Sequence, residues 1–153
     1  MNNNIKFLLI LFVFFISISG CQEKSKLLKG LEEKCRNKSE SVILMRNLVN
    51  FKWDKIGIFQ VGVDRRKIDL FLGYKYKGET DLTRIVIFVY QGKIVYEDRE
   101  FYNPEQPSRV FFNMEQSSIE LNPNNALFRV IREKILKSNC YELLLIKSED
   151  PAK

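Results

Sequence analysis

The strongest constraint on the fold is an unbroken run of β-branched and aromatic residues, IVIFVY at 85–90. This composition is typical of a strand that is buried on both faces. Gln91-Gly92 follows as a two-residue turn, because glycine readily takes a positive φ, and residues 93–97 return as the partner strand. The sequence therefore predicts a β-hairpin over about 85–97, at the centre of an antiparallel sheet.

Helical spacing appears on both sides of this hairpin. Leucines at 27, 28 and 31 share one face of a short helix predicted over about 25–37, and a second helix is predicted over 64–72, with Asp64 and Gly73 as cap candidates. The spacing of apolar residues also favours a helix over 126–137, capped by Asn124 or Asn125, although the alternation there would fit a strand. The pattern of 42–50 fits either a strand or a helix.

Several shorter segments alternate or cluster apolar residues in the manner of strands. They are 51–59, with Trp53 entering the core, 74–77 at a sheet edge, 110–112, 119–121 and 141–146. We therefore expect an α+β fold, in which two or three short helices pack on an antiparallel sheet built around the hairpin.

The amino-terminal segment has the pattern of an export signal. Residues 7–16 are all apolar, which is too short for a bilayer span of about 20 residues but has the length of a signal-peptide core. Ile18-Ser19-Gly20-Cys21 follows, and it resembles the lipobox of bacterial lipoproteins. In that family the cysteine thiol receives a diacylglyceryl group before cleavage ahead of it. An ordinary secretory leader with a chance cysteine, or a buried apolar helix, is the alternative.

The lipobox resemblance implies a domain organisation and a location. Residues 1–20 would be the signal peptide, 21–40 the lipidated terminus, tether and short helix, 41–147 the globular domain and 148–153 a polar tail. Acyl chains on Cys21 would anchor the protein in the cell membrane, since two or more chains give stable attachment. Gln22, where Asp would retain a lipoprotein in the inner membrane, favours the periplasmic face of the outer membrane in a Gram-negative host.

Two further cysteines, Cys35 and Cys140, remain in the mature chain. An exported compartment permits disulfides, so this even pair predicts a structural bond between them, with two unpaired buried thiols as the alternative. Because the chain contains no histidine, two cysteines make a poor metal site, and neither a metal nor a cofactor is expected.

A second resemblance rests on two short motifs of the globular domain. The matching residues are Phe51, Trp53, Asp54, Lys55, Phe59 and the stretch 85–95. They are similar to a group of small bacterial lipoproteins of uncharacterised function, which implies a compact α+β domain on a lipid anchor and supplies no activity. Trp53, Asp54 and Lys55 are interpreted as a structural motif, because an Asp beside a buried Trp more often accepts hydrogen bonds from a turn than performs chemistry.

Catalytic signatures are missing from the sequence. Without histidine the usual proton shuttle near neutral pH is absent, and no nucleophile elbow or phosphate-binding glycine loop occurs. Glu97, Asp98 and Glu100 offer three carboxylates, but neighbours in a strand point to opposite faces. We therefore expect no enzyme, and a small hydrolase that uses paired carboxylates is the least favoured reading.

The formal charge of +6 is spread over interspersed cations and anions, and no nucleic-acid motif appears. Arg65, Arg66 and Lys67 stand at the unfavourable end of a helix dipole, which is a weak indication of a partner-binding surface, with ordinary solvated charge as the alternative. The expected function is a non-catalytic protein-binding or accessory module that faces the periplasm or the cell exterior and binds an envelope protein. The alternative is an immunity or inhibitor lipoprotein against an envelope-targeted toxin or hydrolase.

Overall fold

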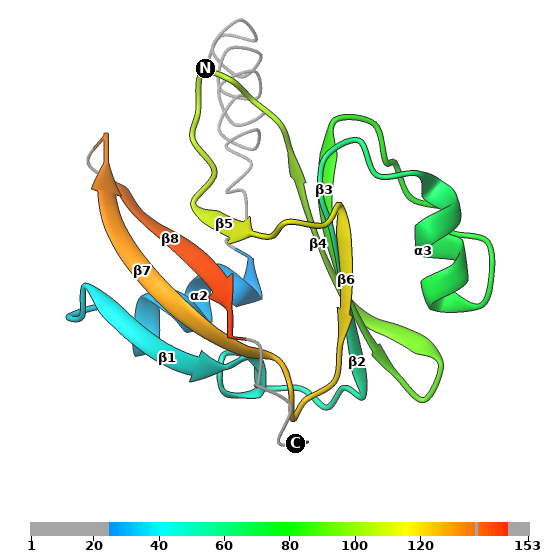
Figure 1. Ribbon diagram of the computed structural model, residues 1–153, viewed down its shortest axis with the longest axis horizontal. Helices are drawn as coiled ribbons and strands as arrows, with labels where there is room; N and C mark the ends of the chain where they lie inside the picture. The colour runs from blue at the N-terminus through cyan, green and yellow to red at the C-terminus, as the bar shows by residue number, and fades with distance from the viewer. Residues whose placement is uncertain (1–24, 137, 147–153) are drawn as a thin grey trace, which may run out of the picture.

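The computed structural model describes residues 25–136 and 138–146, and within them the chain forms an α+β fold of two four-stranded sheets and two α-helices (Figure 1). The first sheet has the order β1-β7-β8-β5, with bounds Glu40–Leu44, Leu127–Ile135, Ser138–Leu145 and Val110–Asn113. The second sheet has the order β4-β3-β2-β6, with bounds Lys93–Phe101, Thr83–Tyr90, Lys55–Phe59 and Ser118–Leu121. The helices are α2, Lys26–Lys34, and α3, Arg65–Leu72. Adjacent strands are antiparallel, except that β5 and β8 are parallel.

Strand β3 lies between two hydrophobic clusters because its side chains alternate between the faces of the second sheet. Val86 and Phe88 join the cluster shared with the first sheet, whereas Ile85, Ile87 and Val89 pack on the side of α3. In Figure 1, α3 accordingly stands on one side of the second sheet and the first sheet stands on the other. The apolar run is thus buried on both faces.

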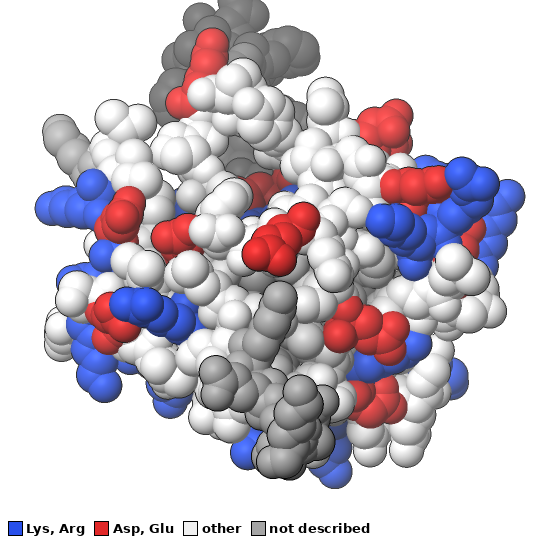
Figure 2. Space-filling model, viewed as in Figure 1, with Lys and Arg blue, Asp and Glu red and all other residues white. Residues whose placement is uncertain are grey.

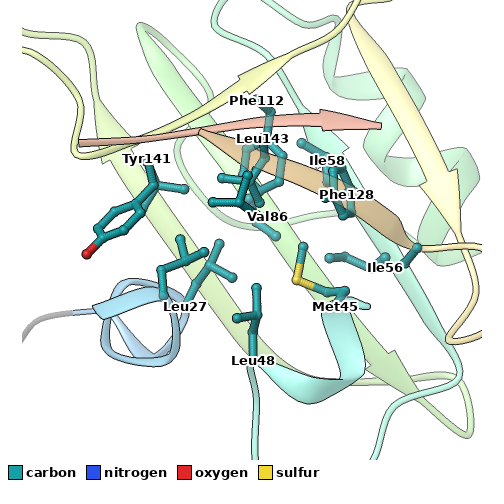
Figure 3. Close-up of a cluster of buried hydrophobic side chains, with 14 of the residues drawn as sticks. Leu27, Met45, Leu48, Ile56, Ile58, Val86, Phe112, Phe128, Tyr141 and Leu143 are labelled. Atoms are coloured by element: carbon teal, nitrogen blue, oxygen red, sulfur yellow. The ribbon is translucent and has the colours of Figure 1, made fainter. Parts of the chain in front are cut away.

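The larger cluster, which we call the central core, fills the space between the two sheets. Figure 3 shows Leu27 of α2 and Leu48 facing side chains from both sheets. Those side chains are Ile56, Ile58 and Val86 of the second sheet and Phe112, Phe128, Tyr141 and Leu143 of the first. Helix α2 therefore contributes its leucine stripe to the same core that joins the sheets.

Both helices begin at residues that can cap them, and α3 also ends at a glycine cap. Ser25 caps α2 by accepting a hydrogen bond from the Leu28 amide at 3.0 Å. Asp64 caps α3 by accepting one from the Arg66 amide at 2.9 Å, and Gly73 ends the helix in the left-handed region at φ 77°. Positive φ favours glycine because it lacks a Cβ. The predicted caps of α3 are confirmed.

The predicted helix over 126–137 is wrong, because Leu127–Ile135 form strand β7. Its alternating residues Phe128 and Val130 are buried in the central core, and β7 is paired on one edge with β1 and on the other with β8. Those two ladders satisfy the backbone donors and acceptors that a helix would have satisfied internally. The ambiguous 42–50 divides into β1 and a 3-10 turn, Met45–Asn47.

Two other expectations about the sheets are corrected. The predicted single sheet is replaced by two, and β4 is the edge strand of the second sheet, so that β2 and β3 are its inner strands. Residues 74–77 form no strand, because the Tyr76 amide donates instead to the Asp69 carboxylate at 2.7 Å and the Tyr76 side chain is buried in the cluster of α3.

Candidate functional site

The first turn of α2 forms hydrogen bonds with side chains of strand β4, and we call this contact the α2–β4 junction. The Ser25 side chain hydrogen bonds to the carboxyl group of Asp98, and the Lys26 amide donates to the Tyr96 hydroxyl at 2.9 Å. The Lys26 ammonium also lies over the rings of Phe51 and Tyr96, 5.4 and 5.2 Å from their centroids. Backbone, hydroxyl and aromatic contacts therefore fix the start of this helix.

Behind the junction lies a half-buried polar cluster centred on Arg84, which is only 8% exposed. Its guanidinium forms an ion pair with Glu100, its cross-strand partner, and donates to the Val110 carbonyl. The Ser108 hydroxyl donates to the same Glu100 carboxylate at 2.8 Å. The cluster joins β3, β4 and the start of β5, and so connects the two sheets where α2 begins.

Burial sets the electrostatics of this cluster. Desolvation raises the pKa of Asp98, while the hydrogen bond from Ser25 and the positive charge of Arg84 oppose the rise. Desolvation also lowers the pKa of Arg84, against the attraction of Glu100 and Asp98. The Arg84 Nε atom is buried and has no hydrogen-bond partner in the described part of the chain. The positive charge of Arg84 thus attracts two carboxyl groups, those of Asp98 and Glu100.

The neighbouring carboxylate, Glu97, points to the opposite face of β4. It accepts a hydrogen bond from the buried Tyr76 hydroxyl and pairs with Arg99 at 2.9 Å. Burial, and then the contact with Glu97, raise the pKa of Tyr76. The three carboxylates of 97–100 are therefore divided by strand geometry, and only Asp98 and Glu100 come together.

Two surface grooves lie outside the polar cluster, one of them beside Lys26 of the junction. One, of about 450 Å³, is lined by the exposed side of α2 and the turn that follows β1, including Lys26, Lys29, Lys34, Asn47 and Asn50. A second, of about 260 Å³, lies over Met114, Ile119 and Leu144. Among residues 25–136 and 138–146, no cluster of three His, Cys, Asp or Glu side chains could hold a metal ion.

The predicted partner surface at the start of α3 has contacts within the fold. Arg66 pairs with Asp64 at 2.7 Å, and Lys67 reaches the Ser117 hydroxyl at 2.7 Å. Arg65 donates to the Gly78 carbonyl at 3.2 Å. Figure 2 shows cationic and anionic side chains side by side over this helix. The cations that oppose the helix dipole are thus accounted for by neighbours, and the sequence argument for a partner surface there is weakened.

The Trp53, Asp54 and Lys55 motif has structural contacts. Trp53 lies in the central core with its ring 5.5 Å from that of Phe88, at 84°. Asp54 accepts a hydrogen bond from the Gln91 amide at 2.6 Å in the turn between β3 and β4. Lys55 donates to the Phe71 carbonyl and so connects β2 to α3.

The two cysteines are buried and free, so the predicted disulfide is not formed in this structure. Cys35 belongs to the central core together with Tyr141, the residue that follows Cys140 on β8. Because successive strand residues point to opposite faces, Cys140 is directed away from that core. The first sheet therefore separates the two thiols, and burial raises the pKa of Cys35.

We expect alkylation of the unfolded protein without reductant to label both Cys35 and Cys140. Neither sulfur needs to be released from a disulfide, because both are free in the fold. Intact-mass analysis after denaturation measures the number of added groups. A mass that shows neither thiol labelled until reductant is added would contradict the separation of the thiols by the sheet.

Replacement of Asp98 by asparagine should change the pH dependence of stability. A carboxyl whose pKa is raised by folding binds protons more tightly when folded, so its contribution to stability falls as the pH rises above the ordinary value of 3.8. Asp98→Asn removes this titration. The free energy of unfolding of the variant minus that of the wild type should therefore increase from pH 4 to pH 7 in urea titrations; a difference that is independent of pH would refute the burial argument.

Sequence reasoning missed Arg84 and Ser108. A signal was available, because Arg84 shares its strand face with Val86 and Phe88, which the apolar run already placed in a core. A cation at such a position needs a buried partner. The partner could not be identified, since Ser108 and Val110 lie on a different segment.

Cys21, the signal segment 1–20 and the tail 148–153 lie outside the described residues, and so does Lys147, the last residue of the predicted domain. No helix among the described residues has the length and apolar character to cross a membrane. Comparisons with protein-family models, with curated proteins and with solved structures find no match.

Proposed function

We propose that the chain is a lipid-anchored bacterial envelope protein that acts as a non-catalytic binding or accessory module. The lipobox-like Ile18-Ser19-Gly20-Cys21 supports the anchor. The observation that carries the proposal is the α2–β4 junction: only Gln22, Glu23 and Lys24 separate Cys21 from the capped start of α2. A lipid on Cys21 would therefore hold a domain whose anchored end is fixed to the sheets.

A surface for a partner is available on the outer face of the first sheet. The buried residues of α2 belong to the central core and those of α3 to the cluster on the far side of the second sheet, so neither helix covers this face. Val42 is 59% exposed there and Phe111 is 50% exposed. Exposed apolar side chains on a sheet face that neither helix covers support a role in binding a protein.

The contacts of the acidic residues favour this class over an enzyme. Asp98 and Glu100 are the paired carboxylates that a small hydrolase would use, and both interact with Arg84 in the polar cluster. A pair neutralised in this way lacks the separate acid and base that hydrolysis requires. An immunity or inhibitor role against an envelope-targeted toxin or hydrolase remains the second candidate, because it uses the same kind of exposed face.

The anchor is tested by metabolic labelling with a fatty-acid analogue. Wild-type protein should carry the label and sediment with membranes, whereas Cys21→Ala should lose both properties. Cys35→Ala is the matched control and should keep the label. An unlabelled wild-type protein that still starts at Met1 would refute the anchor.

The binding role is tested by affinity capture of the lipidated protein from native envelopes. We expect Phe111→Glu to lose partners that the wild type retains, because it places a charge on the open sheet face. Charge reversal of Arg65, Arg66 and Lys67 tests the sequence-based patch in the same assay. If partners are unchanged in every variant, neither surface carries the function.

A further inference from the structure

Three exposed apolar side chains gather at the end of the β3–β4 pair. Leu82 is 63% exposed, and Phe101 and Tyr102 are each 61% exposed. Phe101 is the cross-strand partner of Thr83, and the Tyr102 amide donates to the Leu82 carbonyl at 2.7 Å. These backbone contacts place the three residues, which we call the apolar tip, together at one end of the β3–β4 pair (Figure 1, upper end of β4).

The apolar tip lies close to the start of α2. Asp98, which contacts Ser25, precedes Phe101 by three strand positions, a distance of about 10 Å at about 3.4 Å per residue. From Ser25 back to Cys21 the chain can span at most about 14 Å, because each residue extends by no more than about 3.6 Å. A lipid on Cys21 therefore brings the apolar tip within reach of the same bilayer.

The chemistry of the tip fits the interfacial region of a bilayer. Tyr and other aromatic side chains favour the headgroup level, where the ring is in an apolar layer and the hydroxyl stays hydrated. Charges near the tip are mixed, since Lys26 lies at the start of α2 while Asp81 and Glu105 flank the apolar residues in sequence. Apolar burial, not attraction to anionic lipid, is therefore the dominant force.

We infer that Leu82, Phe101 and Tyr102 insert into the surface of the bilayer that holds the lipid of Cys21. This inference rests on the proposed lipid anchor. The acyl chains then provide one attachment and the apolar tip a second, so that the domain lies on the membrane in one orientation. Two attachment points restrict rotation about the tether, and the outer face of the first sheet is held in a fixed direction.

The test uses mature lipidated protein in phosphatidylcholine vesicles, with a fluorophore attached to Tyr102→Cys. Cys35 and Cys140 are buried at 1% and 7% exposure, so labelling of the folded protein selects the new thiol. Val42→Cys, on a strand of the other sheet, is the matched control because Val42 is 59% exposed. A nitroxide carried on the lipid should quench the fluorophore at 102 at least about threefold more than at 42. This difference should persist in high salt.

A second variant separates insertion from mere proximity. Leu82→Asn with Phe101→Thr removes two apolar side chains, and Asn suits the positive φ of 49° at position 82. Quenching at 102 should then fall to the level at 42. Two outcomes would overturn the inference. One is equal quenching at 102 and 42 in protein that keeps Leu82 and Phe101. The other is quenching at 102 that does not fall when both residues are replaced. Flotation of all variants with the vesicles reports the anchor independently, and its failure would refute the anchor alone.

Discussion

Arg84→Ala is expected to lower the free energy of unfolding by about 3 kcal/mol, the lower end of the range that is typical when one partner of a buried ion pair is removed, because the Glu100 side chain is 35% exposed. The side chain of Arg84 is 9% exposed, and it supplies the positive charge for Glu100 and for the raised-pKa carboxyl of Asp98. The Val110 carbonyl also loses its donor. The variant leaves two carboxyl groups together without a cation, and it leaves a cavity beside them.

Urea unfolding measures this loss, and the fluorescence of Trp53, the only tryptophan, reports on the central core. Arg84→Met keeps most of the volume, and Arg84→Met with Glu100→Gln removes both charges of the pair. We expect the double variant to recover part of the stability lost in Arg84→Met. Arg129→Ala, at an exposed ion pair with Glu40, is the control and should be far milder. Equal effects of Arg84→Ala and Arg129→Ala would contradict the role of the polar cluster.

Gly30→Ala is expected to destabilise the protein by up to about 3 kcal/mol, in the direction opposite to helix propensity. Alanine in place of glycine normally stabilises a helix by about 1 kcal/mol. Here a Cβ at position 30 would lie 2.1 Å from the Leu48 carbonyl oxygen and 2.9 Å from its carbon. These are backbone atoms of the residue that follows the 3-10 turn, so α2 itself must move, and overpacking of this kind costs about 1–3 kcal/mol.

The same movement should loosen the α2–β4 junction. We expect faster hydrogen exchange of the Lys26 amide, which donates to the Tyr96 hydroxyl, in Gly30→Ala than in the wild type. Lys34→Ala, at an exposed position of the same helix where the side chain forms a surface ion pair with Glu33, is the matched control and should change stability and exchange far less. If Gly30→Ala raised the midpoint of urea unfolding, close packing of α2 on Leu48 would be disproved.

Only part of the polar cluster around Arg84 could be predicted from the sequence. Asp98 and Glu100 could be placed on one strand face from period-two alternation, and they do share it. Arg84 belongs to the same face by the same rule, but its burial depends on Ser108, in the segment before β5, and on the carbonyl of Val110, the first residue of β5 in the other sheet. Contacts between segments distant in sequence leave no local pattern. The sequence could therefore indicate that Arg84 is buried, but it could not identify the residues that contact it.

Local chemistry accounts for the elements whose signals lie within a few residues. The caps at Ser25, Asp64 and Gly73 act on the adjacent turn, and the run at 85–90 is apolar on both faces, so these features can be read directly from the chain. Residues 126–137 carry both helical and alternating patterns, and it is the pairing of β7 with β1 and β8 that makes this segment a strand. The split into two sheets and the separation of Cys35 from Cys140 were likewise decided by tertiary structure, because each depends on which strands pair and which face is covered.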